Sequence, residues 1–96
     1  MAQYVILAGF TEQGIRGVKE TSARAKAFKE LAKGHGINVK SIHWTLGAYD
    51  VIIMLEAPND EVVAGLSLKV GSLGNMKCQT LRAFGEAEID AILKPV

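Results

Sequence analysis

The sequence predicts an α+β domain with the element order βαββαβ and a short helix at its C-terminal end. Four short apolar segments, each bounded by polar residues or glycines, have the length and composition of strands. Two longer segments between them carry apolar residues at helical spacing. This order is typical of the ferredoxin-like split βαβ fold, a four-stranded antiparallel sheet with two helices on one face. That fold usually places the first and third strands in the centre of the sheet.

The first half of the chain is expected to begin with a strand, a loop and a helix. Tyr4–Phe10 (YVILAGF) is apolar and predicts the first strand. Thr11–Thr21 holds two glycines and predicts a loop with room for one helical turn. Ser22 is the candidate N-cap of the first helix, and Gly34 and Gly36 end it. The apolar stripe of this helix consists of Ala25, Phe28, Leu31 and Ala32.

Three further strands and a closing helix are expected in the remainder of the chain. Val39–Leu46 and Val51–Ala57 predict the second and third strands, because both are rich in apolar and β-branched residues. Asn75–Arg82 predicts the fourth strand. Glu86–Leu93 predicts a short helix, which completes the order of elements.

The second helix has clear signals at its start and its end. Asn59 is the expected cap, and two acidic residues follow it in the first turn, where the helix dipole favours negative charge. Gly71 and Gly74 are expected to end the helix. Its apolar stripe consists of Val62, Val63, Leu66 and Val70.

Composition and charge restrict the classes of function. The 96 residues suit one domain spanning 1–96, and a hydrophobic content of 49% can supply its core. A net charge of +1 does not indicate nucleic acid or an anionic membrane as a partner, and no apolar segment reaches the roughly 20 residues of a membrane span. The chain opens into a strand without a leader, and its single cysteine, Cys78, cannot form an internal disulfide, so we expect a cytoplasmic protein. No zinc-binding spacing is present, and the sequence indicates no cofactor.

The first and third strands carry apolar residues on both faces. Val5 and Leu7 alternate with equally apolar neighbours, and residues 51–55 are apolar without interruption. An antiparallel sheet with one solvated face alternates apolar and polar residues, and two helices can cover only one face. We therefore expect a second copy of the chain to cover the other face, in a homodimer or a larger even oligomer. The alternatives are that this apolar face is tolerated in solvent or that the C-terminal helix covers it.

Four segments of the chain resemble the GYD-domain family in order and spacing. Gly47-Ala48-Tyr49-Asp50, between two strands, fits the motif that names the family, and FTEQGI (10–15), EAPNDE (56–61) and GSLGNMKCQTLRAF (71–84) accompany it. This resemblance covers nearly the whole chain. It implies a ferredoxin-like domain that pairs as a dimeric α/β barrel, and it implies little about activity. The hairpin also resembles that of Lrp/AsnC effector domains, which bind amino acids between subunits, but this chain has no DNA-binding segment.

The turn can be interpreted in two ways. Gly47 can adopt the positive φ of a tight hairpin, and Asp50 can accept hydrogen bonds from nearby backbone N–H groups. Tyr49 can lay its ring on the end of the sheet and direct its hydroxyl to a partner. None of these roles requires a ligand. Loops on a rigid sheet are nevertheless where binding groups usually lie, so a functional interpretation stays open beside the structural one.

Strand alternation separates the candidate site residues from the core. A hairpin loop with an even number of residues places Trp44 on the apolar face with Val51, and it groups His43 with Asp50 on a mixed face. Apolar walls with a few polar groups are typical of ligand sites. His43 is either a general base or metal ligand in the cavity between subunits, or a hydrogen-bonded interfacial residue. The predicted ligand-binding residues are His43, Thr45, Gly47, Tyr49, Asp50, Phe10 and Gln13.

Three classes of function remain. The preferred one is a module that binds a small molecule between subunits or near the Gly47–Asp50 hairpin. The second is a cofactor-free or haem-type oxygenase or isomerase, and a His43–Asp50 proton pair would favour it. The third is a protein-interaction or regulatory domain. An enclosed apolar cavity would favour the small-molecule binder, and a filled interior would favour the interaction domain. The sequence leaves open whether the chain is an enzyme, because no acid–base pair or nucleophile triad is evident.

Overall fold

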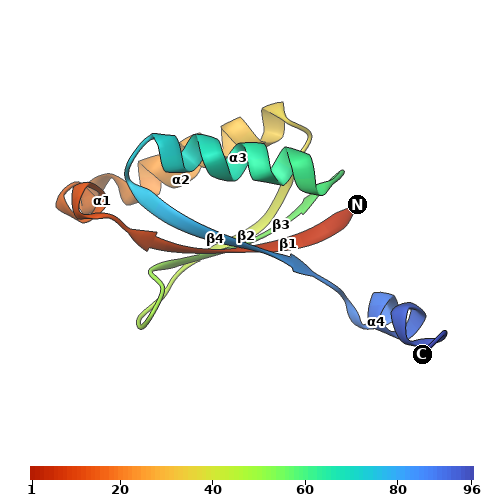
Figure 1. Cartoon of the computed structure of the whole chain (residues 1–96). Coiled ribbons are helices and arrows are strands. Elements are labelled where there is room, and N and C mark those ends of the chain that lie inside the picture. Colours follow the sequence, from red (N-terminus) through yellow and green to blue (C-terminus); the bar gives the residue numbers. More distant parts are fainter.

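The computed structural model describes residues 1–96 and has the predicted order of elements, with two additional short helical segments after the first strand (Figure 1). None of its helices combines the length and the apolar character that a membrane span requires. The elements are β1 (Ala2–Phe10), α1 (Glu12–Arg16), the 3₁₀ helix η1 (Val18–Glu20), α2 (Thr21–Gly34), β2 (Asn38–Trp44), β3 (Val51–Ala57), α3 (Asp60–Ser72), β4 (Met76–Ala83) and α4 (Glu86–Leu93).

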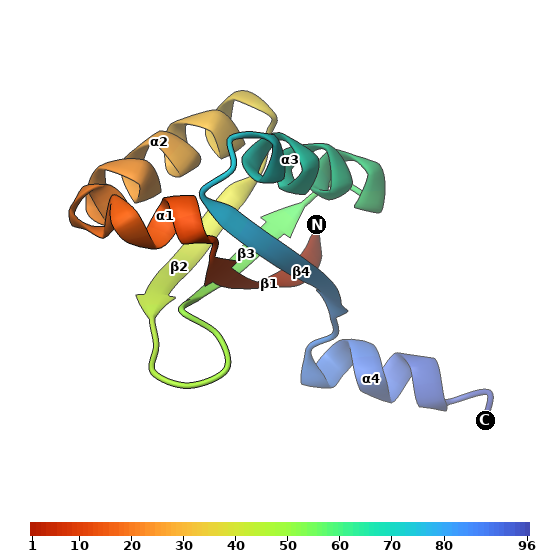
Figure 2. The ribbon, with the colours of Figure 1, turned by 60° about the vertical axis from the view of Figure 1, so that its left-hand side comes forward.

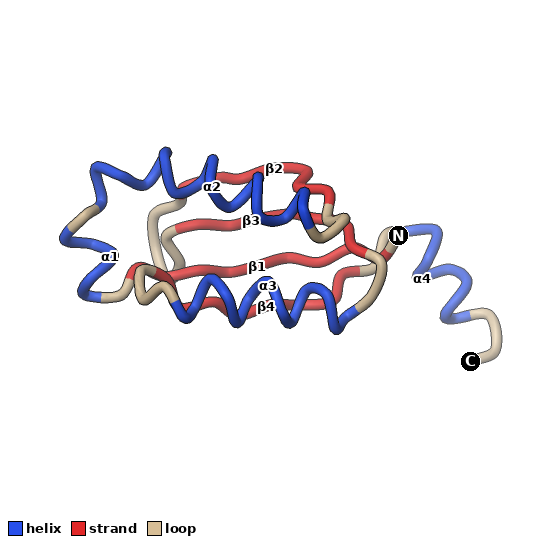
Figure 3. Tube along the Cα trace, turned by 90° about the horizontal axis from the view of Figure 1, so that it is seen from above, coloured by secondary structure: helices blue, strands red, loops and turns tan.

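The four strands form one antiparallel sheet in the order β2-β3-β1-β4. The first and third strands are therefore central, as predicted, and Ile6 of β1 pairs with Ile53 on one side and Thr80 on the other. Helices α2 and α3 lie on one face of the sheet (Figure 1). Viewed from above, α2 runs over β2 and β3, whereas α3 runs over β1 and β4 (Figure 3). The α+β fold class predicted from the sequence is thus confirmed.

The core lies between the sheet and these two helices. Every second residue of β1 and β3 points toward the helices, and Tyr4, Ile6 and Leu55 among them are at most 3% exposed. Val63 and Leu66 supply the matching apolar stripe of α3. Because burial of an aliphatic side chain of this size contributes about 1.5–3 kcal/mol, this layer is the main source of stability.

The segment after β1 is more helical than predicted. The Thr11 hydroxyl accepts a hydrogen bond from the Gly14 N–H at 3.0 Å and caps α1. The 3₁₀ helix η1 then runs directly into α2, and the Glu20 N–H donates to the Gly17 carbonyl at 2.9 Å. The prediction of Ser22 as N-cap is therefore wrong. Glu20 holds that position without a side-chain hydrogen bond, because the preceding turn already continues into the helix.

Helix α3 begins at the predicted cap but ends later than predicted. Asn59 caps the helix as expected, and its side-chain oxygen accepts from the Val62 N–H at 3.0 Å. Gly71 does not end the helix, which continues through one more residue. The chain leaves the helical path at Gly74, whose φ of +84° is readily adopted only by glycine.

Strands β2 and β4 begin and end one or two residues away from their predicted limits. The Thr45 N–H donates to the Asp50 carbonyl at 2.8 Å and closes the hairpin, so β2 ends at Trp44. Leu46 consequently lies fully exposed in the loop and does not share a strand face with Trp44. Asn75 belongs to the turn before β4, because its carbonyl accepts from the Thr11 N–H at 3.1 Å.

Candidate functional site

The face of the sheet opposite α2 and α3 carries apolar residues from its central strands and from β4. We call this surface the open face; its apolar members are Val5, Leu7, Ile52, Met54 and Leu81. Helix α4 does not cover it, because that helix projects beyond the end of β4 (Figures 1 and 2). The suggestion that the C-terminal helix shields this face is therefore wrong.

Polar residues on the open face come from the two edge strands, from the β2–β3 loop and, at one end of the central strands, from Gln3 and Glu56. The loop extends to the side of the sheet away from α2 and α3 (Figure 1). Tyr49 in this loop donates its hydroxyl hydrogen to the Gln79 side-chain oxygen at 2.9 Å, so the two opposite edges of the sheet are joined by one side chain. Gln79 pairs in register with Leu7, and His43 pairs with Ile52. The mixed face predicted from strand alternation is thus present.

Asp50 connects the hairpin to the end of β1. Its N–H donates to the Ala8 carbonyl at 2.9 Å, and its carboxylate accepts from the Phe10 N–H at 2.9 Å. The carboxylate therefore serves a backbone donor at the point where β1 ends. This contact joins residues 40 positions apart, and it explains why an acidic residue stands at the close of the turn.

The rest of the turn is held by local contacts. The Thr45 hydroxyl donates to the Tyr49 carbonyl at 2.7 Å. Gly47 has a φ of +118°, as predicted, and a Cβ added there would meet no atom within 4 Å. Backbone conformation alone therefore calls for glycine at this position.

The other predicted site residues lie apart from the turn. Phe10 contacts Asp50 only through its backbone, because its side chain packs on the core side of the sheet. The Gln13 amide donates to the Leu73 carbonyl at 3.2 Å and to the Asn75 side-chain oxygen at 3.0 Å, which places it against the α3–β4 turn. Of the seven predicted residues, four therefore lie together in the hairpin turn. His43 lies on β2, and the side chains of Phe10 and Gln13 pack elsewhere.

His43 is exposed on β2 and makes no hydrogen bond or ion pair with Asp50, whose carboxylate accepts from Phe10. The proton pair that would have favoured an enzyme is therefore not formed in this structure.

Cys78 faces the helices rather than the open face, and burial raises the pKa of its thiol, which disfavours the reactive thiolate. No cluster of three or more His, Cys, Asp or Glu side chains is arranged to hold a metal ion.

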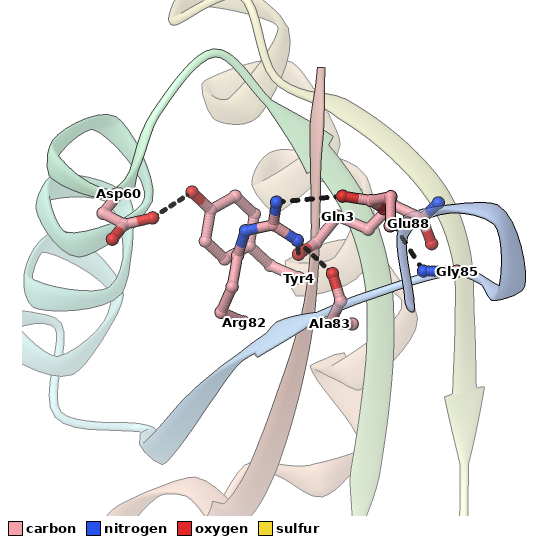
Figure 4. Close-up of polar contacts among 7 residues, drawn as sticks. All are labelled: Gln3, Tyr4, Asp60, Arg82, Ala83, Gly85 and Glu88. Carbon is pink, nitrogen blue, oxygen red and sulfur yellow. Dashed lines mark hydrogen bonds and ion pairs between the residues drawn. The ribbon is translucent and has the colours of Figure 1, made fainter. Parts of the chain in front are cut away.

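A polar network at the far end of the sheet was not foreseen from the sequence. Tyr4 donates its hydroxyl hydrogen to Asp60 at the start of α3, and this hydrogen bond raises the pKa of the Tyr4 hydroxyl (Figure 4). The Arg82 guanidinium lies 4.4 Å from the Phe84 ring centroid and 3.2 Å from the Glu88 carboxylate. The N–H of Gly85 and the Arg82 guanidinium lower the pKa of Glu88. The contacts of Glu88 with Arg82 and Gly85 attach α4 to the end of β4, whereas the Tyr4–Asp60 contact joins β1 to α3.

Comparisons with known proteins identify a family and a relative of similar length. The family model for the GYD domain matches residues 4–93. A protein of Thermus thermophilus, named glutamine synthetase and cystathionine beta-lyase binding protein, is 30% identical over 95 residues, which are 98% of this chain and 100% of that protein. No solved structure gives a significant match.

Proposed function

Because the chain belongs to the GYD domain family, we propose that it is a homodimeric binding protein whose partner is a metabolic enzyme, with glutamine synthetase as the first candidate. One observation carries this proposal. The match to the Thermus relative extends over the whole of that protein, so the partners given in its name are bound by this domain alone. The region that this chain shares with the relative therefore includes the surface that binds those partners.

The homodimer accounts for the open face. Its apolar residues lie on neighbouring strands without a covering layer from the same chain. Contiguous exposed apolar surface of this kind is typical of protein interfaces. A second copy, sheet against sheet, would cover the same residues on both chains, as the two-fold symmetry of most dimers requires.

Helix α4 offers a separate surface for the enzyme. Ile89, Ile92 and Leu93 follow the i, i+3, i+4 spacing of one helical stripe, and they are 40%, 46% and 55% exposed. An apolar stripe on a projecting helix is suited to insertion into a groove of a partner protein. The Arg82–Glu88 contact fixes the base of this helix and so sets the direction in which the stripe points.

Binding of purified enzymes tests this function directly. The protein is mixed at micromolar concentration with glutamine synthetase or cystathionine β-lyase from its source organism, and complexes are measured by size-exclusion chromatography with light scattering. We expect glutamine synthetase to co-elute with the protein. The double substitution Ile89→Lys with Ile92→Lys should abolish the complex, whereas Ala87→Lys, on the opposite side of α4, should preserve it. If neither enzyme forms a complex with the protein, the proposal is overturned.

A small molecule held between the paired sheets is a second candidate, and the mixed character of the open face favours it. The Tyr49–Gln79 pair and His43 lie among apolar residues, a composition typical of ligand sites. The side chains of Thr45 and Asp50 are already hydrogen-bonded within the turn. His43 has no such partner and keeps its full hydrogen-bonding capacity. Native mass spectrometry of protein purified from its own host would reveal a retained ligand, and His43→Gln should release it while the dimer stays intact.

A further inference from the structure

An apolar cavity of about 170 Å³ lies on the other side of the sheet, beneath α2 and α3. The two helices run over opposite halves of the sheet (Figure 3), and the cavity occupies the space between them. Fourteen of its 18 lining residues are hydrophobic. Its walls include Phe28 and Leu31 from α2, Trp44 from β2, Val70 from α3 and Met76 from β4. This volume is separate from the open face and from the α4 stripe.

Small side chains cause the cavity. Ala8 lies on the floor, and the half-buried Ala25 borders it from α2, where a core helix would normally place a larger residue; Ala27, which is exposed, also borders the cavity. Protein interiors are otherwise packed to a density that leaves few voids larger than a water molecule. The polar groups at the margin are already paired in part: the Thr21 hydroxyl accepts from the Trp44 indole N–H at 2.9 Å. A ligand for this space therefore needs an apolar body.

The volume indicates the size of that body. An apolar cavity of about 150 Å³ lined by aliphatic and aromatic side chains is known to bind benzene. A space of about 170 Å³ therefore accommodates one six-membered ring or a branched aliphatic group of similar size. The rings of Phe28 and Trp44 on its walls suit flat or branched groups of this kind.

Arg24 gives the cavity an uncompensated positive charge. Arg24 is among the residues that line the cavity, and its guanidinium donates to the carbonyls of Gly14 at 3.1 Å and Gly17 at 2.9 Å. No carboxylate lies within ion-pair distance of it, since the three ion pairs of the chain involve other residues. A guanidinium has five N–H donors, so Arg24 retains donors for an anionic group.

We propose that this cavity binds a small aromatic or branched aliphatic monocarboxylate. The apolar group lies between α2 and α3, and the carboxylate is bound by Arg24. The site belongs to a single chain and depends neither on dimerisation nor on the enzyme partner proposed above. The sequence contains one signal for it, the small residue Ala25 on the apolar stripe of α2.

The methionines of the chain provide an internal control for the test. Met76 lines the cavity, whereas Met54 lies on the open face. With methyl-¹³C methionine, addition of benzoate or 4-methylpentanoate should shift the Met76 methyl resonance and leave that of Met54 unchanged. A shift of Met54 alone, or of neither residue, at millimolar probe concentrations would overturn the proposal.

Two substitutions separate the apolar from the anionic contribution. Arg24→Gln should weaken benzoate binding at least tenfold while leaving the binding of uncharged toluene within about twofold, because toluene uses the apolar walls alone. Ala25→Leu should fill the cavity and abolish the response of Met76 to both probes. If Ala25→Leu fails to fold, the smaller Ala25→Val replaces it. Equal loss of toluene and benzoate in Arg24→Gln would show that Arg24 only supports the structure.

Discussion

Asp50 shows how one residue of the Gly-Ala-Tyr-Asp turn stabilises the fold at long range. Its carboxylate binds the N–H of Phe10, which lies beyond the last pairing of β1 with β3, and its own N–H extends the contact between the loop and β1. Tyr49 reaches Gln79 on β4, and Gly47 supplies the positive φ. Each of these three residues of the motif therefore has a structural role. His43, on β2, makes no side-chain hydrogen bond and is exposed.

Substitution of Asp50 should separate hydrogen bonding from charge. Asp50→Ala leaves the Phe10 N–H without its acceptor, and we expect a loss of about 1–3 kcal/mol in the free energy of unfolding. Asp50→Asn retains an acceptor oxygen and should cost less. Urea denaturation of the two variants measures the difference. Equal and small losses would contradict the proposed role of the carboxylate.

Gly47 allows a prediction with a neighbouring control. Gly47→Val should lower the free energy of unfolding by about 1–3 kcal/mol, because a β-branched residue resists the observed φ of +118°. Ala48→Val, one position later in the same exposed loop, should have a smaller effect. Urea midpoints decide between them, and equal midpoints would show that the loop can adopt another conformation.

Among the elements, α4 combines an exposed apolar stripe with a polar attachment. Arg82 contacts Glu88 and the Gln3 carbonyl (Figure 4). Its guanidinium also lies over the ring of Phe84. The helix otherwise has no buried residue. Its position therefore depends on this attachment more than on packing, which makes it sensitive to charge.

The lowered pKa of Glu88 predicts an acid-sensitive helix. Because the folded pKa lies below the ordinary value of 4.5, the ionised form stabilises the attachment above that pH, and the contribution is lost as the pH falls through the folded value. The protection factors of the amides in residues 86–93, which are corrected for the pH dependence of intrinsic exchange, should fall on acidification from pH 5. Glu88→Gln should have low protection factors at pH 5 already, with a weaker pH dependence. The same pH dependence in both proteins would exclude Glu88 as the cause.

For the whole molecule, the distribution of apolar surface predicts self-association. The helices bury one face of the sheet, whereas the other face has no helical layer and is crossed only by the β2–β3 loop, whose Tyr49 contacts Gln79. The proposed dimer, the α4 stripe and the cavity beneath α2 and α3 occupy three different surfaces. A protein of this size could therefore bind itself, an enzyme and a small molecule at the same time.

Light scattering at micromolar concentration should give at least twice the monomer mass of 10.3 kDa. Ile52→Glu should reduce the mass to that of the monomer, because it places a charge at the centre of the open face. Ala23→Glu adds the same charge on the exposed side of α2 and should leave the oligomer intact. A wild-type protein that is folded at 10.3 kDa would contradict the prediction.

The sequence alone determined the order of elements, the two faces of the sheet, the cap at Asn59 and the positive φ of Gly47. These features follow from local periodicity and from backbone preferences of single residues. Only the tertiary structure decided what Asp50 binds, where α4 lies and which polar groups surround Arg82, because these contacts join residues far apart in the chain. The cavity is also a feature that only the tertiary structure decided. The sequence shows the three alanines that border it, but whether neighbouring side chains fill the space between them depends on the separation of two helices.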